Sequence, residues 1–232
     1  MILAAGRGTR MGGLTADLPK PMLPVKGRPL LEHVLDRLRA AGIRRAFLVT
    51  GYRAETIERH FENYPLEIVF QRQERIDGTG SAALLARGFA GSDDFLLTFG
   101  DILAGAADYQ RMMAILAEDP HAEAGVGARW VDDPWQGAAV YEENGRVVRI
   151  VEKPPRGASS THWNSAGLYG FRPSVFEELA LIQRSPRGEY ELTSAVDAMI
   201  TKGKRLVLCP MLEPWRDVGR PEDLDAAGAM IP

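Results

Sequence analysis

Residues 1–13 carry the sequence MILAAGRGTRMGG, in which a short apolar run, Ile2–Ala5, leads directly into a glycine-rich loop. An apolar run of this length that ends in glycine is typical of a buried strand followed by a turn. Open α/β sheets bind their ligands at such loops, outside the carboxyl ends of the strands. Glycines let backbone N–H groups approach an anion closely, and Arg7 and Arg10 add positive charge. We therefore predict an anion-binding loop at Gly6–Gly13.

Two familiar phosphate-binding motifs do not match this loop. The P-loop string GxxxxGK[ST] does not occur anywhere in the sequence. The dinucleotide fingerprint needs a third glycine where the chain has Met11, and an acidic residue at the end of the second strand, where it has Thr50-Gly51. The loop therefore belongs to a different class of phosphate site.

Short apolar strands alternate with helical patterns through the first half of the chain. We predict strands at 2–5, 46–50, 66–70 and 95–99, and helices at 30–41, 54–61, 80–89 and 109–117. Strands that are apolar throughout and separated by helices are typical of a parallel sheet covered on both faces.

The second half contains more strands and a hairpin signal. We predict strands at 124–130, 138–142, 147–151, 168–171 and 206–208, helices at 175–181 and 192–200, and a last helix after Pro221. Asn144-Gly145 is typical of a two-residue hairpin turn. Because no linker divides the chain, we predict one α/β domain over residues 1–232. It is a three-layer Rossmann-like sandwich, mostly parallel, with a small antiparallel insertion.

Composition excludes several classes of protein. The chain has 232 residues, 45% of them hydrophobic, and a net charge of −3. These values exclude a mainly disordered chain, and they give no basic field for nucleic acid or anionic lipid. A single cysteine, Cys209, rules out an internal disulfide, and no apolar run is long enough to span a membrane. We expect a cytoplasmic protein that binds neither nucleic acid nor membrane.

Six strings occur in chain order, each at a predicted strand end or loop. They are Leu3–Met11 with Leu18–Pro21, Gln73 with Gly78-Thr79, Gly100-Asp101, Glu152–Pro154, Gly167–Tyr169 and Trp215–Gly219. Together they resemble the signature of the sugar-1-phosphate nucleotidylyltransferases, or NDP-sugar pyrophosphorylases, over nearly the whole chain. The resemblance implies a Mg²⁺-dependent enzyme that joins a nucleoside triphosphate to a sugar 1-phosphate and releases pyrophosphate. It assigns nucleotide binding to residues 1–120, approximately, and sugar binding to residues 121–232.

The resemblance also implies roles on the nucleotide side. Arg10, Lys20 and Asp101 would be catalytic, and Asp101 with Asp217 would hold Mg²⁺, which takes one or two carboxylates plus substrate phosphates. The nucleotide would be bound by Leu3, Ala4, Ala5, Gly6, Gly8, Thr9, Arg10, Lys20, Gln73, Gly78 and Thr79. The alternative for Asp101 is a turn or helix-capping residue after a strand.

The chemistry itself asks for charge neutralisation more than for a base. A sugar phosphate with a second pKa of about 6 is mostly dianionic at neutral pH and is already a nucleophile. This agrees with the absence of a persuasive histidine or cysteine constellation. We expect His33 and His60, which lie on charged helices, to be solvated.

On the sugar side, the resemblance implies that Glu152 accepts hydrogen bonds from sugar hydroxyls and Lys153 binds the sugar phosphate. Gly137 and Gly167 would meet the sugar through their backbone. The alternative for Glu152-Lys153 is a solvated charge pair at a strand end.

Near Gly167 the chain departs from the family pattern. Relatives have an asparagine two positions before this glycine, where the chain has Ser165, and Asn164 lies one position earlier. We still assign Asn164, by the resemblance, to the sugar-phosphate site together with Gly137, Glu152, Lys153 and Gly167. The argument against Asn164 is that neighbouring strand residues point to opposite faces.

Gln73 precedes Gly78 by five positions, a spacing that resembles uridylyl- and thymidylyltransferases. A Gln amide offers both donors and an acceptor to a pyrimidine edge, so UTP or dTTP is the expected nucleotide. Gln71 is a competitor, and a solvated Gln73 is the alternative. CTP or GTP, a heptose, aminosugar or choline phosphate, and a catalytically silent nucleotide-binding relative also stay open, as does a homo-oligomer.

Overall fold

The computed structural model describes residues 1–231 and divides the chain into two compact units, neither of which is continuous in sequence. Unit 1 consists of Met1–Ile76, Thr98–Gln110 and the stretch from Leu212 onward. Unit 2 consists of Asp77–Leu97 and Arg111–Met211. Unit 1 therefore gathers segments from both ends and the middle of the chain, which only folding brings together.

A parallel sheet forms the core of unit 1. Its order is β5-β4-β1-β6, with β1 (Ile2–Leu3), β4 (Arg45–Thr50), β5 (Glu67–Arg72) and the end of β6 (Phe95–Phe99). Ile2 pairs with Leu48 on one side and with Thr98 on the other, and all three are at most 1% exposed. β1 and β4 are thus buried between parallel neighbours, as the sequence pattern predicts, whereas the edge strand β5 is largely exposed.

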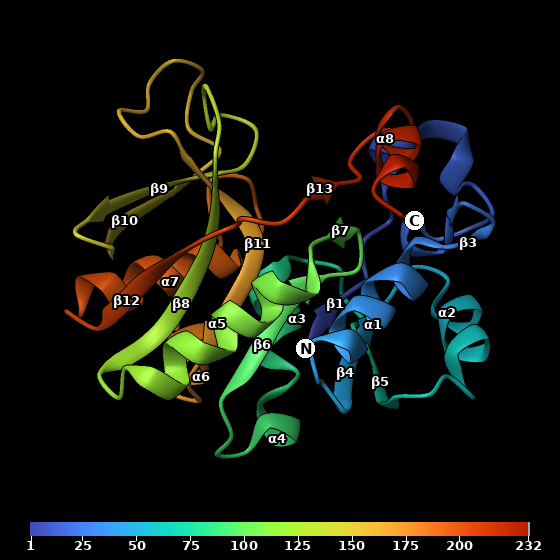
Figure 1. Ribbon diagram of the computed structural model, residues 1–232, viewed down its shortest axis with the longest axis horizontal. Coiled ribbons are helices and arrows are strands. Elements are labelled where there is room, and N and C mark those ends of the chain that lie inside the picture. The colour runs from blue at the N-terminus through green and yellow to red at the C-terminus, as the bar shows by residue number, and fades with distance from the viewer. Residues whose placement is uncertain (232) are drawn as a thin grey trace. The chain divides into compact units, whose positions relative to one another are not determined.

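Two helices of unit 1 follow the predicted pattern closely. They are α1 (Leu30–Ala40) and α2 (Ala54–Phe61), and α2 packs on β4 and β5 (Figure 1). In α1 the residues Leu31, Val34, Leu35 and Leu38 form one fully buried stripe at helical spacing. His33, expected at the surface, is only 5% exposed, and its Nε2 lies 2.9 Å from the carbonyl oxygen of Val25. The expectation of a solvated His33 is wrong, because the β-hairpin at residues 24–29, which includes Val25, covers this side chain.

Several short elements of unit 1 were not predicted. They are the 3₁₀ segments η1 (Thr9–Thr15) and η2 (Lys20–Met22), the hairpin of β2 (Pro24–Val25) and β3 (Arg28–Pro29), and the two-residue strands β7 (Ile102–Leu103) and β13 (Arg216–Asp217). β7 and β13 pair antiparallel. Apart from η1, these elements have two or three residues and are too short to show periodicity. The predicted final helix is present as α8 (Asp223–Ala229).

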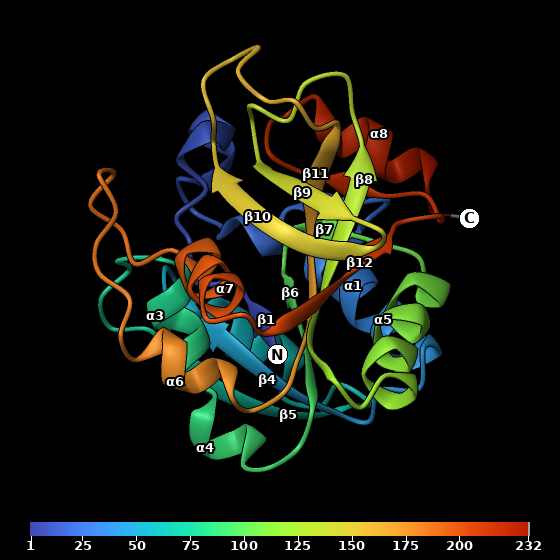
Figure 2. The same ribbon diagram turned by 90° about the vertical axis from the view of Figure 1, so that its left-hand side faces the viewer.

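Unit 2 is built on a sheet in the order β6-β11-β8-β12-β10-β9. The strands are β8 (Ala122–Trp130), β9 (Ala138–Glu143), β10 (Arg146–Glu152), β11 (Trp163–Phe171) and β12 (Arg205–Pro210). β12 is parallel to β8, whereas β8–β11, β9–β10, β9–β11 and β10–β12 are antiparallel. Asn144 and Gly145 both have positive φ, which confirms the predicted hairpin between β9 and β10 (Figure 2).

The helices of unit 2 are α3 (Thr79–Leu84), α4 (Arg87–Ala90), α6 (Val175–Leu179) and α7 (Leu192–Thr201), while α5 (Ala106–Glu118) begins in unit 1. α7 packs on β10, α6 and α3 (Figure 2). The single helix predicted at 80–89 is thus two short helices. Among residues 1–231, no helix is both long and apolar enough to cross a membrane.

Candidate active site

The glycine-rich loop of unit 1 closes over Lys20. Gly8 has a φ of +65°, and a Cβ atom on it would lie 2.7 Å from the Cβ of Lys20, so the position requires glycine. The Thr15 hydroxyl donates to the carbonyl of Gly8 at 3.1 Å and so holds the loop in place. Among the described residues, nothing accepts a hydrogen bond from the N–H groups of Gly6 and Gly8. The loop therefore presents backbone donors and a cation together.

Lys20, which the loop covers, contacts two carboxylates. Its Nζ lies 2.5 Å from Oδ2 of Asp101 and 3.9 Å from Oδ1 of Asp217, and the Lys20 side chain is only 7% exposed. The two aspartates meet because β13 pairs with β7, and the Val218 N–H donates to the Asp101 carbonyl at 3.0 Å. The side chains of Asp101 and Asp217 are 28% and 46% exposed, so their oxygens are open to a ligand.

The surroundings of Asp217 disfavour its charged form. Partial burial and the nearby Asp101 carboxylate raise the pKa of Asp217 to about 6, although Lys20 and Arg10 act in the opposite direction. A Cβ on Gly219 would lie within 3.8 Å of both Arg10 Nη1 and Asp217 Oδ1, so Arg10 also belongs to the cluster. Two neighbouring carboxylates with hard oxygen atoms suit a divalent cation. Within residues 1–231 there is no group of three or more His, Cys, Asp or Glu side chains that could hold a metal ion.

Gln73 lies directly after β5 in unit 1 and is buried, with 7% of its surface exposed. Its backbone N–H donates to the Thr50 carbonyl at 2.8 Å. The competitor Gln71 is exposed on the strand and donates to the carbonyl of Arg72. The solvated alternative for Gln73 is therefore excluded, and the two glutamines are distinguished by burial.

Gly78 and Thr79 open α3 in unit 2. Gly78 has a φ of +139°, and a Cβ on it would lie 2.2 Å from the Tyr190 carbonyl oxygen. The Thr79 hydroxyl accepts a hydrogen bond from the Leu192 N–H at 3.0 Å, at the start of α7. Thr79 therefore uses its hydroxyl oxygen to hold the start of α7.

Glu152 is the centre of a polar cluster in unit 2. It accepts from Arg187 Nη1 at 3.1 Å and from the Thr193 hydroxyl at 3.2 Å, and Lys153 Nζ lies 4.0 Å away. Burial raises the pKa of Glu152, although Lys153 and Arg187 act against it. Arg187 also lies 3.2 Å from Glu191. Lys153 has a φ of +41°, a left-handed conformation that is uncommon outside glycine and is found at functional positions.

Asn164 faces Gly137 in the same unit. A Cβ on Gly137 would lie 2.3 Å from Asn164 Oδ1, and this oxygen is buried without a hydrogen-bond partner. The strand register shifts between Ser165 and Tyr169, where Gly167 has a φ of +67°. The simple alternation of faces that counted against Asn164 is interrupted here by a bulge. An unpartnered buried acceptor favours Asn164 as a ligand-binding residue.

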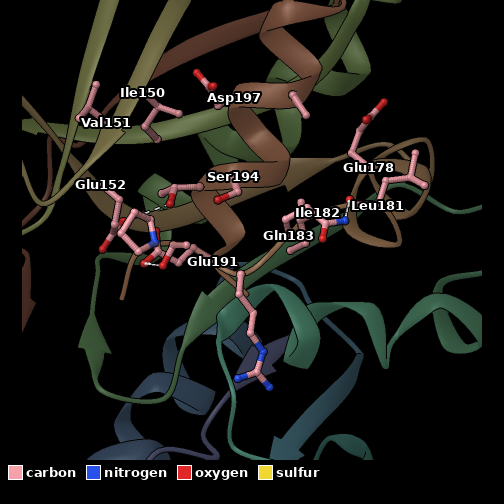
Figure 3. A pocket seen from close by; sticks show the side chains of 15 residues that line it. Ile150, Val151, Glu152, Glu178, Leu181, Ile182, Gln183, Glu191, Ser194 and Asp197 are labelled. Atoms are coloured by element: carbon pink, nitrogen blue, oxygen red, sulfur yellow. Dashed lines mark hydrogen bonds between the residues drawn. The ribbon is translucent and has the colours of Figure 1, made fainter. Parts of the chain in front are cut away.

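A pocket of about 480 Å³ lies beside this cluster in unit 2. Glu152, Glu191 and Ser194 point toward it, with Ile150 and Ile182 among its apolar walls (Figure 3). The pocket is formed by β10, α7 and the segment that joins α6 to α7.

The sequence analysis thus identified the charged residues at the centre of each cluster but missed several side chains that contact them. The structure brings together Lys20, Asp101 and Asp217 in unit 1, and Glu152 with Lys153 in unit 2. Residues that sequence analysis missed are Arg187, Glu191 and Thr193 around Glu152, and Asp223 beside Asp217. The dense run of charges at 187–191 was the one available signal.

Comparison with known proteins identifies the family. The sequence profile described as nucleotidyl transferase matches residues 1–231. The UTP–glucose-1-phosphate uridylyltransferase AglF of Haloferax volcanii is 34% identical over 98% of this chain and 93% of its own length. The bifunctional protein GlmU of Methanococcus maripaludis is 33% identical over 99% of this chain, which spans only 53% of that relative. The chain therefore covers about half the length of its bifunctional relatives.

Solved structures share the fold. A UDP-glucose pyrophosphorylase complexed with UDP-glucose has a TM-score of 0.88 at 22% identity and covers 99% of this chain and 98% of its own. A UDP-glucose pyrophosphorylase from Acinetobacter baumanii has a TM-score of 0.80 at 25% identity, covering 98% and 90%. These likenesses confirm the predicted Rossmann-like α/β class. The profile match and the relatives above show that this chain belongs to the nucleotidyl transferase family.

Proposed function

We propose that the protein transfers a nucleotidyl group from UTP or dTTP to a sugar 1-phosphate and releases pyrophosphate. The observation that carries the proposal is Lys20 in contact with both Asp101 and Asp217 under a glycine-rich loop. The name of the Haloferax relative, which specifies UTP and glucose 1-phosphate, supports this choice of substrates.

The reaction would form one phosphorus–oxygen bond and break another. A phosphate oxygen of the sugar phosphate attacks the α-phosphorus in line, and the bond from the α-phosphorus to the bridging oxygen breaks. Pyrophosphate leaves with the electron pair. Arg10 would stabilise this growing charge, Lys20 would bridge phosphates near the α-phosphorus, and the N–H groups of Gly6 and Gly8 would bind phosphate oxygens.

Asp101 and Asp217 would hold Mg²⁺. Carboxylate oxygens are its preferred protein ligands, and the neighbouring Asp101 and Asp217 carboxylates provide them. When bound, the ion would neutralise phosphate charge.

The sugar 1-phosphate would be bound by residues of unit 2. Glu152 would accept hydrogen bonds from sugar hydroxyls, while Lys153, at the strained position after it, would bind the phosphate. Gly137 would meet the sugar through its backbone, and Asn164 would contribute its unpartnered Oδ1. Gly167 would act indirectly, because its positive φ forms the bulge beside Asn164.

The choice of a pyrimidine base rests on Gln73. Because Gln73 is buried after β5, its amide is held in place and can pair with the base edge. UTP and dTTP differ by one methyl group, worth only ~1 kcal/mol of burial, so both are included.

The test is pyrophosphate release over a matrix of nucleotides and phosphate substrates. We expect the highest kcat/KM with UTP or dTTP and a hexose 1-phosphate. A maximum with GTP or ATP would overturn the base assignment, and a maximum with a heptose, aminosugar or choline phosphate would overturn the hexose. Nucleotide binding without pyrophosphate release from any pair would indicate the silent, regulatory alternative.

A further inference from the structure

Asp108 fixes the chain segment that leads to Asp217. It lies in the first turn of α5 in unit 1 and is fully buried, with 0% of its surface exposed. Its Oδ1 accepts the N–H of Leu212 at 3.0 Å and its Oδ2 accepts the N–H of Glu213 at 3.2 Å. One carboxylate thus accepts hydrogen bonds from two successive backbone N–H groups, those five and four residues before Asp217.

Asp223 fixes the same segment from the other side. Its Oδ2 accepts the N–H of Gly219 at 3.0 Å and of Arg220 at 2.9 Å. Its Oδ1 lies 3.4 Å from Arg216 Nη1. Asp217 therefore lies between two carboxylates, each of which accepts hydrogen bonds from a pair of neighbouring N–H groups.

Besides these two carboxylates, the β7–β13 pairing and the Val218 N–H, which donates to the Asp101 carbonyl at 3.0 Å, place Asp217 in unit 1. The β7–β13 ladder joins only Arg216 with Leu103 and Asp217 with Ile102. The Asp217 side chain is 46% exposed, so packing does not hold it. The chain just before α5 approaches the segment so closely that a Cβ on Gly105 would lie 2.3 Å from the Cβ of Glu213. The firm attachment of this segment is at its start, where Asp108 lies.

We infer that Asp108 is a positioning residue that sets the place of the Asp217 carboxylate relative to Asp101 and Lys20, with Asp223 completing the attachment. Hydrogen bonds that a buried carboxylate accepts are strong. If asparagine replaces Asp108, its NH₂ group faces a backbone N–H group, and one of the two hydrogen bonds is lost. Outer groups of this kind tune metal affinity by roughly 10–100-fold. This inference rests on the proposed metal pair.

The experiment compares Asp108→Asn with the wild-type enzyme and with Ile57→Ala. Ile57 is fully buried in α2 of unit 1 and has no part in the proposed site, so its cavity controls for lost stability. We expect Asp108→Asn to raise the Mg²⁺ concentration for half-maximal turnover by roughly 10-fold or more. KM for the sugar phosphate should stay within about twofold. Hydrogen exchange in the enzyme without substrates should accelerate over residues 211–220.

In Ile57→Ala we expect a lower melting temperature with an unchanged Mg²⁺ requirement. Equal Mg²⁺ requirements in Asp108→Asn and Ile57→Ala would overturn the inference, as would unchanged exchange over 211–220. If Asp108→Asn does not fold, Asp223→Asn replaces it, because that side chain is 20% exposed. The same two results would then decide. Asp217→Asn distinguishes failure of the proposed metal pair from failure of the positioning role. Normal Mg²⁺ dependence in Asp217→Asn would exclude the metal pair itself. Loss of turnover in Asp217→Asn, together with normal Mg²⁺ dependence in Asp108→Asn, would exclude only the positioning role.

Discussion

Replacing Gly8 with alanine tests whether the loop and Lys20 act as one unit. Alanine at a φ of +65° costs about 1–2 kcal/mol of folding free energy. Its Cβ would also lie 2.7 Å from Lys20 Cβ, so the Lys20 backbone must retreat by about 0.7 Å to reach ordinary contact at 3.4 Å. Overpacking of this kind adds about 1–3 kcal/mol, for a total of about 2–5 kcal/mol. For a chain of this size, the melting temperature falls by roughly 4–20 °C.

Turnover should fall as well, because moving the Lys20 backbone disturbs the position of its Nζ, which lies 2.5 Å from Asp101. A misplacement of about 1 Å can cost on the order of 100-fold in rate. The matched control is Gly27→Ala, where φ is +78° but no atom lies within 4 Å of the added Cβ. Thermal unfolding and pyrophosphate release are measured for both variants. The reasoning is refuted if Gly8→Ala is no less stable than Gly27→Ala, or if it turns over at the wild-type rate.

Three further predictions concern the proposed chemistry. Asp101→Asn and Asp217→Asn should each cost about 2–4 kcal/mol at the transition state with the fold retained, measured as kcat at saturating Mg²⁺ beside circular dichroism; near-normal turnover in either would remove the metal pair. Arg10→Ala should lower kcat more than it raises KM, because the charge it meets grows as pyrophosphate leaves, whereas Lys153→Ala should raise KM for the sugar phosphate; exchanged patterns in steady-state kinetics would contradict the division of roles. Gln73→Ala should reduce the preference for UTP or dTTP over GTP by about 1–3 kcal/mol in a nucleotide panel, and an unchanged preference would exclude Gln73 from base selection.

Local patterns in the sequence were sufficient to predict a helix or strand wherever its buried residues recur at a regular spacing. The predicted helix at 54–61 and the strand at 95–99 match α2 and β6 to the residue, and the Asn144-Gly145 turn joins β9 to β10. The glycine-rich loop at the end of β1, and the motifs that place the chain in its family, also needed only the order of residues. These features depend on neighbours within a few positions, which a sequence displays directly.

Only the tertiary structure decided where side chains from distant segments meet. Lys20 and Asp101 are 81 positions apart, and no periodicity indicates that Lys20 Nζ contacts Asp101 at 2.5 Å. The strand predicted to start at residue 168 begins at Trp163, because Gly167 forms a bulge instead of ending it. Asp108 lies one position before the helix predicted at 109–117, yet it is fully buried and accepts hydrogen bonds from the N–H groups of Leu212 and Glu213. Such contacts are set by how strands and helices pack against one another, and that packing brings together residues whose separation along the chain carries no signal.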